Sequence, residues 1–219
     1  MKLESLADMT AHFIEKLIIT DELKPGQQIK EDDIAAKLDI SRPPVREAFK
    51  TLEGQGLVIR KPRKGTFVVE MMEKDIREVY TLKAELYALA TKLAMDKIIQ
   101  QEKDALSRLV QEMTVVVNAE PCDILTYQKI HSRFHNLIME ISGNTRLLNF
   151  ASNLHKQIRR FSYQTLHYKD HLENSSAYHG KIMACIIDGD SINAARLMKD
   201  HVIDAMNFLL DIPNIFVEE

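Results

Sequence analysis

The sequence predicts a mainly α-helical protein with two domains, one over residues 1–70 and one over residues 71–219. Before residue 70 the apolar runs are short and broken by glycine and proline, and they end in two alternating segments around a basic turn. After residue 70 only three glycines and two prolines remain, and long runs with apolar residues every three or four positions lie between them. The first pattern is typical of short helices and a β-hairpin, and the second of an all-helical bundle.

Length and composition are those of a soluble globular protein. The chain has 219 residues, of which 45% are hydrophobic and 28% are charged. The apolar runs are interrupted by charge, so we expect no membrane span, and the N-terminus lacks the apolar core of a signal peptide. Cys122 and Cys185 have no metal-type spacing and are expected to be reduced thiols. These features together predict a cytoplasmic protein.

The elements expected before residue 70 follow the order helix, helix, helix and hairpin. They are a helix over 10–20, a helix over 31–40, a helix that begins after Ser41 and ends at Gly54, and strands over 57–60 and 66–70. Ser41 is a favourable N-cap residue, and Pro43 and Pro44 suit a first turn because their missing N–H groups cost little there. This order is that of a winged helix-turn-helix, in which one helix enters the major groove of DNA.

Basic residues gather on the third helix and on the hairpin. Residues 42–64 hold seven basic and two acidic side chains, a balance of +5, although the whole chain carries −3. Such a local concentration is the footprint expected of a small DNA-contacting surface, and a solvated charged face is the alternative. The basic residues lie on the two elements that a winged helix applies to DNA, and this placement favours the first interpretation.

From residue 70 onward, the periodicity predicts six helices of an antiparallel bundle and no strand. The helices are expected near residues 73–99, 102–118, 123–142, 145–167, 171–188 and 191–210. Two segments, "SGN" at 142–144 and "DGD" at 188–190, combine a glycine that ends one helix with an Asn or Asp that caps the next. The resulting bundle of about 150 residues has the size of an ordinary domain.

Four histidines fall on these predicted helices. His131 and His135 lie four residues apart, so one helix face carries both. His179 and His201 belong to two further helices and have apolar neighbours. A bundle can bring such positions together in its core, where an unsatisfied histidine is costly. For each histidine taken alone, a surface side chain or a hydrogen-bonded core residue is the alternative.

The stretch "LKPGQQIKEDDIAAKLDISRPPVREAFKTLEGQGLVIRKPRKGTFV" resembles the GntR family of bacterial transcription regulators. The helical half resembles the FCD type, the effector-binding half of FadR-like members, through "VYTLKAELYALATKLA", "HSRFHNLIMEISGN", "YHGKIMACIIDGD" and "AARLMKDHV". Its six helices are nearer to the short VanR-like branch. The resemblance implies a regulator rather than an enzyme, whose DNA affinity is controlled by a small organic acid bound near a divalent metal.

For the DNA-binding half, the resemblance implies a homodimer on a short palindromic operator in double-stranded DNA. Arg42 and Arg46 would read bases through bidentate contacts to guanine, and Ser41 and Lys50 would meet phosphates. Glu47 would orient an arginine rather than touch DNA. The wing tip would consist of Lys64, Gly65 and Thr66.

In many FCD domains an Asp and a His four residues apart join two later histidines on a divalent metal. The resemblance places His135, His179 and His201 at the histidine positions, and His131 at the position of the usual Asp. Four nitrogen ligands suit Zn²⁺ or Ni²⁺ and disfavour Mg²⁺ and Ca²⁺. Two arrangements stay open. Either four histidines bind one ion and leave positions for an effector carboxylate, or His131 turns away and three histidines hold the metal.

Lys83 stands where many FCD domains have an arginine that binds a carboxylate effector, and it would offer a point charge in place of a fork. Two other functions stay open, a purely structural metal and a metal-dependent enzyme built on the bundle. The enzyme is disfavoured because residues 131–140 hold no HExxH motif, and Glu140 lies five residues from His135, off its face.

Overall fold

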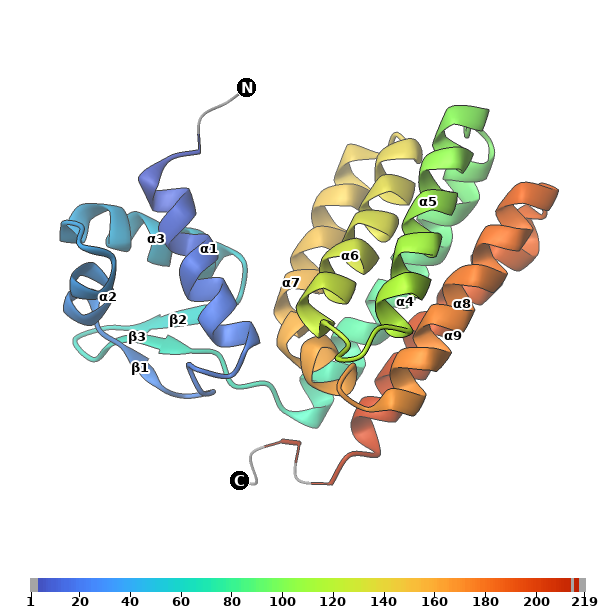
Figure 1. Ribbon diagram of the computed structural model, residues 1–219. Helices are drawn as coiled ribbons and strands as arrows, with labels where there is room; N and C mark the ends of the chain where they lie inside the picture. The colour runs from blue at the N-terminus through green and yellow to red at the C-terminus, as the bar shows by residue number, and fades with distance from the viewer. Residues whose placement is uncertain (1–3, 214, 217–219) are drawn as a thin grey trace. The chain divides into compact units, whose positions relative to one another are not determined.

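The computed structural model describes residues 4–213 together with residues 215 and 216. The chain divides into two compact units, the first made mainly of residues up to Met72 and the second mainly of residues from Glu73. Figure 1 shows the elements of both, and each unit is described by itself below. The mainly helical fold, with a small sheet near the N-terminus and a helical C-terminal part, confirms the predicted fold class.

Short helices and a small antiparallel sheet make up the first unit. Its elements are α1 (Leu6–Ile19), β1 (Gln28–Ile29), α2 (Glu31–Leu38), α3 (Arg42–Gly54), β2 (Val58–Lys61) and β3 (Gly65–Val68). The strand order is β1-β3-β2, and Thr66 of the central strand lies opposite both Ile29 and Arg60. The predicted hairpin is confirmed with slightly shifted ends. The sequence did not predict β1, because two residues are too few to show alternation.

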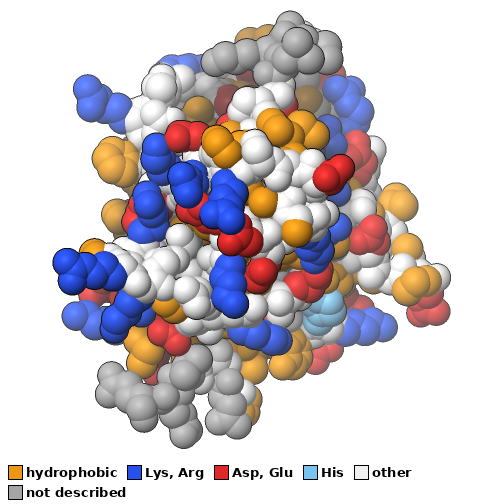
Figure 2. All heavy atoms as spheres, turned by 90° about the vertical axis from the view of Figure 1, so that its left-hand side faces the viewer, with side chains coloured by type: hydrophobic (Ala, Val, Ile, Leu, Met, Phe, Trp, Pro, Cys, Tyr) orange, Lys and Arg blue, Asp and Glu red, His pale blue; other side chains and the backbone are white. Residues whose placement is uncertain are grey.

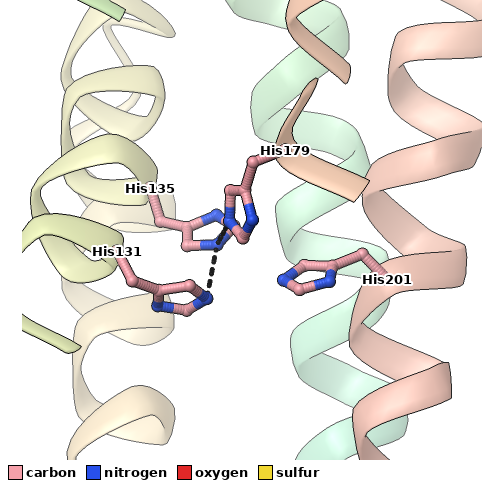
Figure 3. Close-up of side chains that lie close together, drawn as sticks. All are labelled: His131, His135, His179 and His201. Carbon is pink, nitrogen blue, oxygen red and sulfur yellow. Dashed lines mark hydrogen bonds between the residues drawn. The ribbon is translucent and has the colours of Figure 1, made fainter. Parts of the chain in front are cut away.

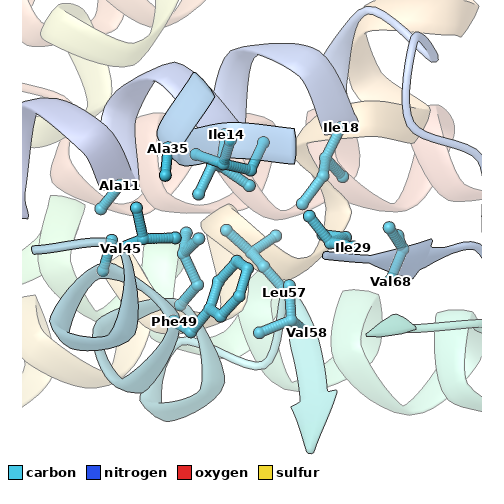
Figure 4. Packing of buried hydrophobic residues seen from close by; sticks show 13 residues of the cluster. Ala11, Ile14, Ile18, Ile29, Ala35, Val45, Phe49, Leu57, Val58 and Val68 are labelled. Carbon is cyan, nitrogen blue, oxygen red and sulfur yellow. The ribbon is translucent and has the colours of Figure 1, made fainter. Parts of the chain in front are cut away.

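The core of the first unit lies between the three helices and the sheet (Figure 4). Its buried members are Ala11, Ile14, Ile18, Ile29, Ile34, Ala35, Val45, Ala48, Phe49, Leu52, Leu57, Val58 and Val68. On α3 the apolar positions recur at helical spacing, so the helix turns one face to this core. Arg42, Arg46 and Lys50 lie on the other face and are exposed. The packing of α3 therefore presents its basic residues to solvent.

Long helices form the second unit, and its described residues contain no strand. They are α4 (Glu73–Met95), α5 (Gln100–Val117), α6 (Ile124–Ile141), α7 (Thr145–Thr165), α8 (Lys169–Asp188) and α9 (Ser191–Leu210). Helix α9 packs along α4 and α8, while α6 packs against α4 and α5. The bundle predicted from the sequence is confirmed, although the first helix ends at Met95 and not near residue 99. No helix among the described residues has the length and apolarity to cross a bilayer.

Side-chain caps fix where three of the long helices begin. The carboxylate of Asp123 accepts a hydrogen bond from the N–H of the third residue of α6, and Asp190 does the same for α9. The amide oxygen of Asn144 caps α7 in this way. Gly143 and Gly189, with φ of 66° and 75°, adopt the left-handed conformation that ends a helix. The two predicted stop-and-start segments are thus confirmed.

Candidate metal centre and nucleic-acid interface

Three helices bring four histidines to one place in the core of the second unit. His131 and His135 project from α6, His179 from α8 and His201 from α9. Figure 3 shows the four rings turned toward a common centre. One possible ligand atom from each ring lies within 4.8 Å of all the others, and none of the four residues is more than 6% exposed. His131 therefore does not turn away from the other three histidines.

The nitrogen contacts in this cluster cannot all be hydrogen bonds between neutral rings. Nε2 of His135 lies 3.2 Å from Nε2 of His131 and 3.1 Å from Nε2 of His179. Nδ1 of His179 is 2.6 Å from the carbonyl oxygen of Ser175, which can only accept, so this nitrogen carries the proton and Nε2 has a lone pair. A single proton on His135 can serve one of its two contacts. Converging lone pairs of this kind are the arrangement that a bound cation satisfies.

Burial keeps these four side chains uncharged. It lowers the pKa of His131, His135 and His201 well below the usual value, and neighbouring charges lower it further. Burial also lowers the pKa of His179 to about 4, although the hydrogen bond to Ser175 acts in the opposite direction. Neutral imidazole is the form that binds a metal ion.

A hydrogen-bonded chain orients one of the rings. The Nδ1–H of His179 donates to the carbonyl of Ser175, one turn earlier on α8, and the hydroxyl of Tyr127 donates to Oγ of Ser175 at 3.1 Å. Such outer contacts fix which nitrogen faces a metal. Nδ1 of His131 and of His135 has no hydrogen-bond partner among the described residues. A bound cation would hold these two nitrogens as N–H donors, because it would take the lone pair of each Nε2.

The residues fit a divalent ion of intermediate hardness. A tetrahedral site with metal–nitrogen distances near 2.0–2.1 Å places its ligand atoms ~3.3 Å apart, close to the separations of 3.1 and 3.2 Å. Among the described residues no carboxylate belongs to the group. An all-nitrogen set matches Zn²⁺ or Ni²⁺, and it does not match the oxygen preference of Mg²⁺ or Ca²⁺.

A buried lysine adjoins this cluster. Lys83 on α4 is 6% exposed, and its Nζ lies 4.7 Å from the ring centre of Tyr87 and 5.7 Å from that of Tyr80. The ring of Tyr87 in turn lies 5.1 Å from that of His135. Burial lowers the pKa of Lys83 to about 7. No salt bridge of Lys83 occurs within the described part of the chain, so the charge of its protonated form adds to that of any bound cation.

In the first unit, the two arginines predicted to read bases begin α3. Arg42 is the first residue of the helix and Arg46 follows one turn later. More than half of each side chain is exposed. Nε of Arg46 lies 2.7 Å from Oε2 of Glu31, and Nε of Arg42 pairs with Oδ1 of Asp32. Both carboxylates belong to the first turn of α2.

The other predicted contacts on α3 are also exposed. Ser41 occupies the N-cap position, but its side chain makes no capping hydrogen bond, so its hydroxyl is not committed to the helix. Lys50 pairs with Glu47 at 2.8 Å. The expectation that Glu47 orients an arginine is therefore wrong. At this spacing on one helix, Glu47 faces Lys50, and the arginines take their acids from α2.

The wing turn is held by a side chain from β1. Nε2 of Gln28 donates to the carbonyl oxygen of Lys64 at 2.7 Å, and Gly65 follows with φ of 107°. Lys64 is exposed, whereas Thr66 is only 6% exposed and lies in the central strand. The turn between β2 and β3 consists of Pro62, Arg63 and Lys64, so Lys64 lies at the tip of the wing, while Gly65 begins β3 and Thr66 belongs to its support.

Three of the residues that shape these sites escaped sequence reasoning. The sequence pattern assigns Glu31, Asp32 and Gln28 no role at either site. Each acts through a partner at least ten residues away, and such partners depend on how α2, α3 and the sheet pack. The acidic run "EDD" ahead of two exposed arginines was the one available signal.

Comparison with known proteins relates this chain to bacterial transcription regulators. The family described as "bacterial regulatory proteins, gntR family" matches residues 6–68, and the FCD domain family matches residues 78–204. The chain is 29% identical over 147 residues to the uncharacterized HTH-type transcriptional regulator YdhC of Bacillus subtilis (strain 168), covering 66% of this chain and 64% of YdhC. It is 27% identical over 151 residues to the gluconate operon transcriptional repressor of the same strain, covering 69% and 61%.

These matches therefore span less than two thirds of both relatives. Among solved structures, E. coli McbR/YncC has the same fold, with a TM-score of 0.82 and 18% identity over 94% of this chain and 97% of that one. The families and relatives that this chain matches are transcriptional regulators and not enzymes, as the resemblance implied. The VanR-like branch stays a prediction. Because the FCD domain alone covers more than half of the residues, the chain belongs to the GntR family of bacterial regulatory proteins that carry an FCD domain.

Proposed function

We propose that this protein is a DNA-binding transcriptional regulator whose operator affinity is controlled by a small carboxylate effector, bound near a divalent metal in the helical unit. The observation that carries this proposal is the division of chemistry between the two units. One exposes two arginines on α3, the helix that a winged helix-turn-helix would apply to DNA, and the other buries four metal-type ligands in its core. A homodimer on a palindromic operator follows from the usual pairing of such helices with half-sites.

In the DNA-binding unit, Arg42 and Arg46 provide the base contacts and Ser41 and Lys50 the phosphate contacts. All four are exposed on or next to α3, and an exposed guanidinium can donate two parallel hydrogen bonds to guanine. The wing adds Lys64 and a backbone approach at Gly65. Figure 2 looks at the side of α2 and the wing, where Lys and Arg gather with Asp and Glu among them.

In the helical unit, His131, His135, His179 and His201 would hold the metal. A bound divalent ion would supply a positive charge that a carboxylate oxygen can ligate. Four neutral imidazoles leave that charge uncompensated, and Lys83 lies close enough to lower the pKa of three of these histidines. An anionic effector would compensate this excess of positive charge. Gluconate, which appears in the name of one relative, is a small carboxylate and supports this class of ligand.

Regulation then takes the form of a shift between two populations. The effector favours the state in which its site is better formed, and operator affinity changes by its difference in affinity for the two states. The residues around Met72, where the first unit gives way to the second, are the proposed route of this coupling. A purely structural metal is the second candidate, because four buried ligands from three helices would also brace the bundle.

The DNA proposal is tested with Arg46→Ala. We expect this variant to lose specific operator binding while the metal content of the purified protein stays unchanged, because Arg46 belongs to α3 and the histidines to other helices. DNase footprinting on selected operator DNA measures the first property, and elemental analysis measures the second. Protection of the operator by the Arg46→Ala variant would refute the assignment of α3.

The metal proposal is tested by elemental analysis of His135→Ala, His131→Ala and His131→Asp. We expect His135→Ala to lose the ion. His131→Ala would lose most of it if four histidines bind, and would keep it if three suffice. His131→Asp would keep a metal but accept Mn²⁺ more readily, because one oxygen ligand replaces nitrogen. A chelator that lowers the unfolding temperature without changing the response of DNA binding to carboxylates would favour the structural metal.

A further inference from the structure

We propose that Glu31 and Asp32, in the first turn of α2, are positioning residues that hold Arg46 and Arg42 in the orientation needed to read bases. This inference rests on the proposed DNA binding by α3. It assigns a role to two acids that would otherwise oppose binding to a polyanion. It also explains why two acidic side chains lie directly beside the arginines of a recognition helix.

Both ion pairs use the same nitrogen of the arginine. Nε of Arg46 donates to Glu31 at 2.7 Å, and Nε of Arg42 pairs with Asp32. A guanidinium has five N–H donors, so a carboxylate on Nε leaves donors on the two terminal nitrogens free. Two parallel donors of this kind match O6 and N7 of guanine. The acids thus fix the plane of each guanidinium without occupying its reading edge.

The local sequence explains why the acids stand where they do. The first turn of α2 reads Glu31, Asp32 and Asp33, and acids are favourable there because of the helix dipole. Ile34 and Ala35 on α2 are buried in the core, and α2 packs against α3. This packing brings two of the three carboxylates to the arginines. The third, Asp33, is exposed and forms no ion pair within the described residues.

Positioning has a consequence for selectivity. A free arginine on a flexible side chain binds any phosphate, which gives affinity without sequence preference. An arginine held by a carboxylate carries less net charge toward phosphates and is already oriented toward a base edge. Loss of the carboxylate should therefore raise affinity for unrelated DNA and lower the advantage of the operator.

The test compares Glu31→Gln and Asp32→Asn with Asp33→Asn in the full-length protein. All three remove one negative charge from the same helical turn, but only the first two remove an arginine partner. Wild-type protein first selects its preferred sequence from duplexes with a randomised centre. Each variant is then titrated against that sequence and against the unselected pool. We expect the ratio of the two affinities to fall roughly three- to tenfold in Glu31→Gln and Asp32→Asn, and to stay within about twofold in Asp33→Asn.

A charge-keeping variant tests whether the carboxylate itself is needed at this position. Glu31→Asp shortens the side chain but keeps the carboxylate, and we expect it to recover part of the lost selectivity. If all three neutralising variants change both affinities equally, the acids act only through their charge and the inference is wrong. If wild-type protein selects no sequence from the pool, the proposed DNA-binding function fails, and this inference fails with it.

Discussion

At the scale of single residues, Lys83 places an ammonium group inside the helical unit, where its charged form is unfavourable. It is 6% exposed, and its neighbours Tyr80 and Tyr87 stay neutral because burial raises their pKa. Burial lowers the pKa of Lys83 from 10.5 to about 7. The unfolded chain therefore binds more protons than the folded one between these values, and the folded state gains stability as pH rises through this window.

We accordingly expect Lys83→Met to raise the free energy of unfolding of the metal-free protein by about 2–4 kcal/mol at pH 7. The gain over wild type should shrink toward pH 9, because the wild-type lysine is then largely neutral when folded. Urea denaturation at the two pH values measures this. Lys92→Met, an exposed position on the same helix, is the control and should change little. An unchanged or lower stability of Lys83→Met at pH 7 would show that the lysine has a stabilising partner.

Gly65 is a second residue whose substitution should measurably lower stability. Its φ of 107° is one that side chains rarely adopt, and an added Cβ would lie 2.8 Å from Nε2 of Gln28. We expect Gly65→Ala to lower the free energy of unfolding by roughly 1–3 kcal/mol. Gly54→Ala is the matched control, since it lies at the end of α3 with no atom within 4 Å of the added Cβ. Thermal unfolding that ranks Gly54→Ala as the more damaging change would contradict this account of the wing.

The candidate sites show what residue patterns can and cannot predict. Resemblance to the FCD type identified all four histidines, and helical spacing was consistent with their entry into a bundle core. They could not decide whether His131 faces the other rings, since that depends on side-chain rotation and on the approach of α8 and α9. The acids that hold Arg42 and Arg46 were missed for the same reason. Ion pairs between helices follow from tertiary packing rather than from local sequence.

At the scale of elements, helix ends differ in how much their caps contribute. Asn144 caps α7 through a hydrogen bond to the N–H of Leu147 at 3.1 Å, whereas Ser41 caps α3 by position only. We expect Asn144→Ala to cost about 1 kcal/mol of stability and Ser41→Ala less than about 0.5 kcal/mol. Equilibrium denaturation measures both values. Equal losses would mean that the Ser41 hydroxyl bonds the helix in solution and is not reserved for DNA.

Long elements were predictable and short ones were not. The helices from α4 to α9 each repeat their apolar pattern over several turns, so their number and order followed from the sequence. Their ends were less certain where no cap marks them, as at Met95, where α4 stops before its apolar pattern does. The strand β1 has two residues and exists because β3 pairs with it. Its presence depends on a partner almost forty residues away, which local patterns do not reveal.

At the scale of the whole molecule, all four candidate metal ligands belong to the second unit. The effect of metal binding on stability can therefore be measured separately in each unit. The histidines come from α6, α8 and α9, while the core of the first unit contains no member of the cluster. A ligand that binds only the folded state stabilises it by RT ln(1 + [L]/Kd), or about 2.7 kcal/mol at a hundredfold excess over Kd. We expect this stabilisation to be largest in the helices that carry the four histidines.

We therefore expect Zn²⁺, added to chelator-treated protein, to slow amide hydrogen exchange in peptides from α6, α8 and α9. Peptides from the α1–α3 core should change much less, because none of their residues binds the ion. His135→Ala should abolish the effect, whereas His167→Ala, which removes an exposed histidine from the same unit, should preserve it. Exchange measured by mass spectrometry resolves these segments. Slowing that persists in His135→Ala would place the ion elsewhere, and uniform slowing over both units would show that metal binding stabilises the molecule as one body.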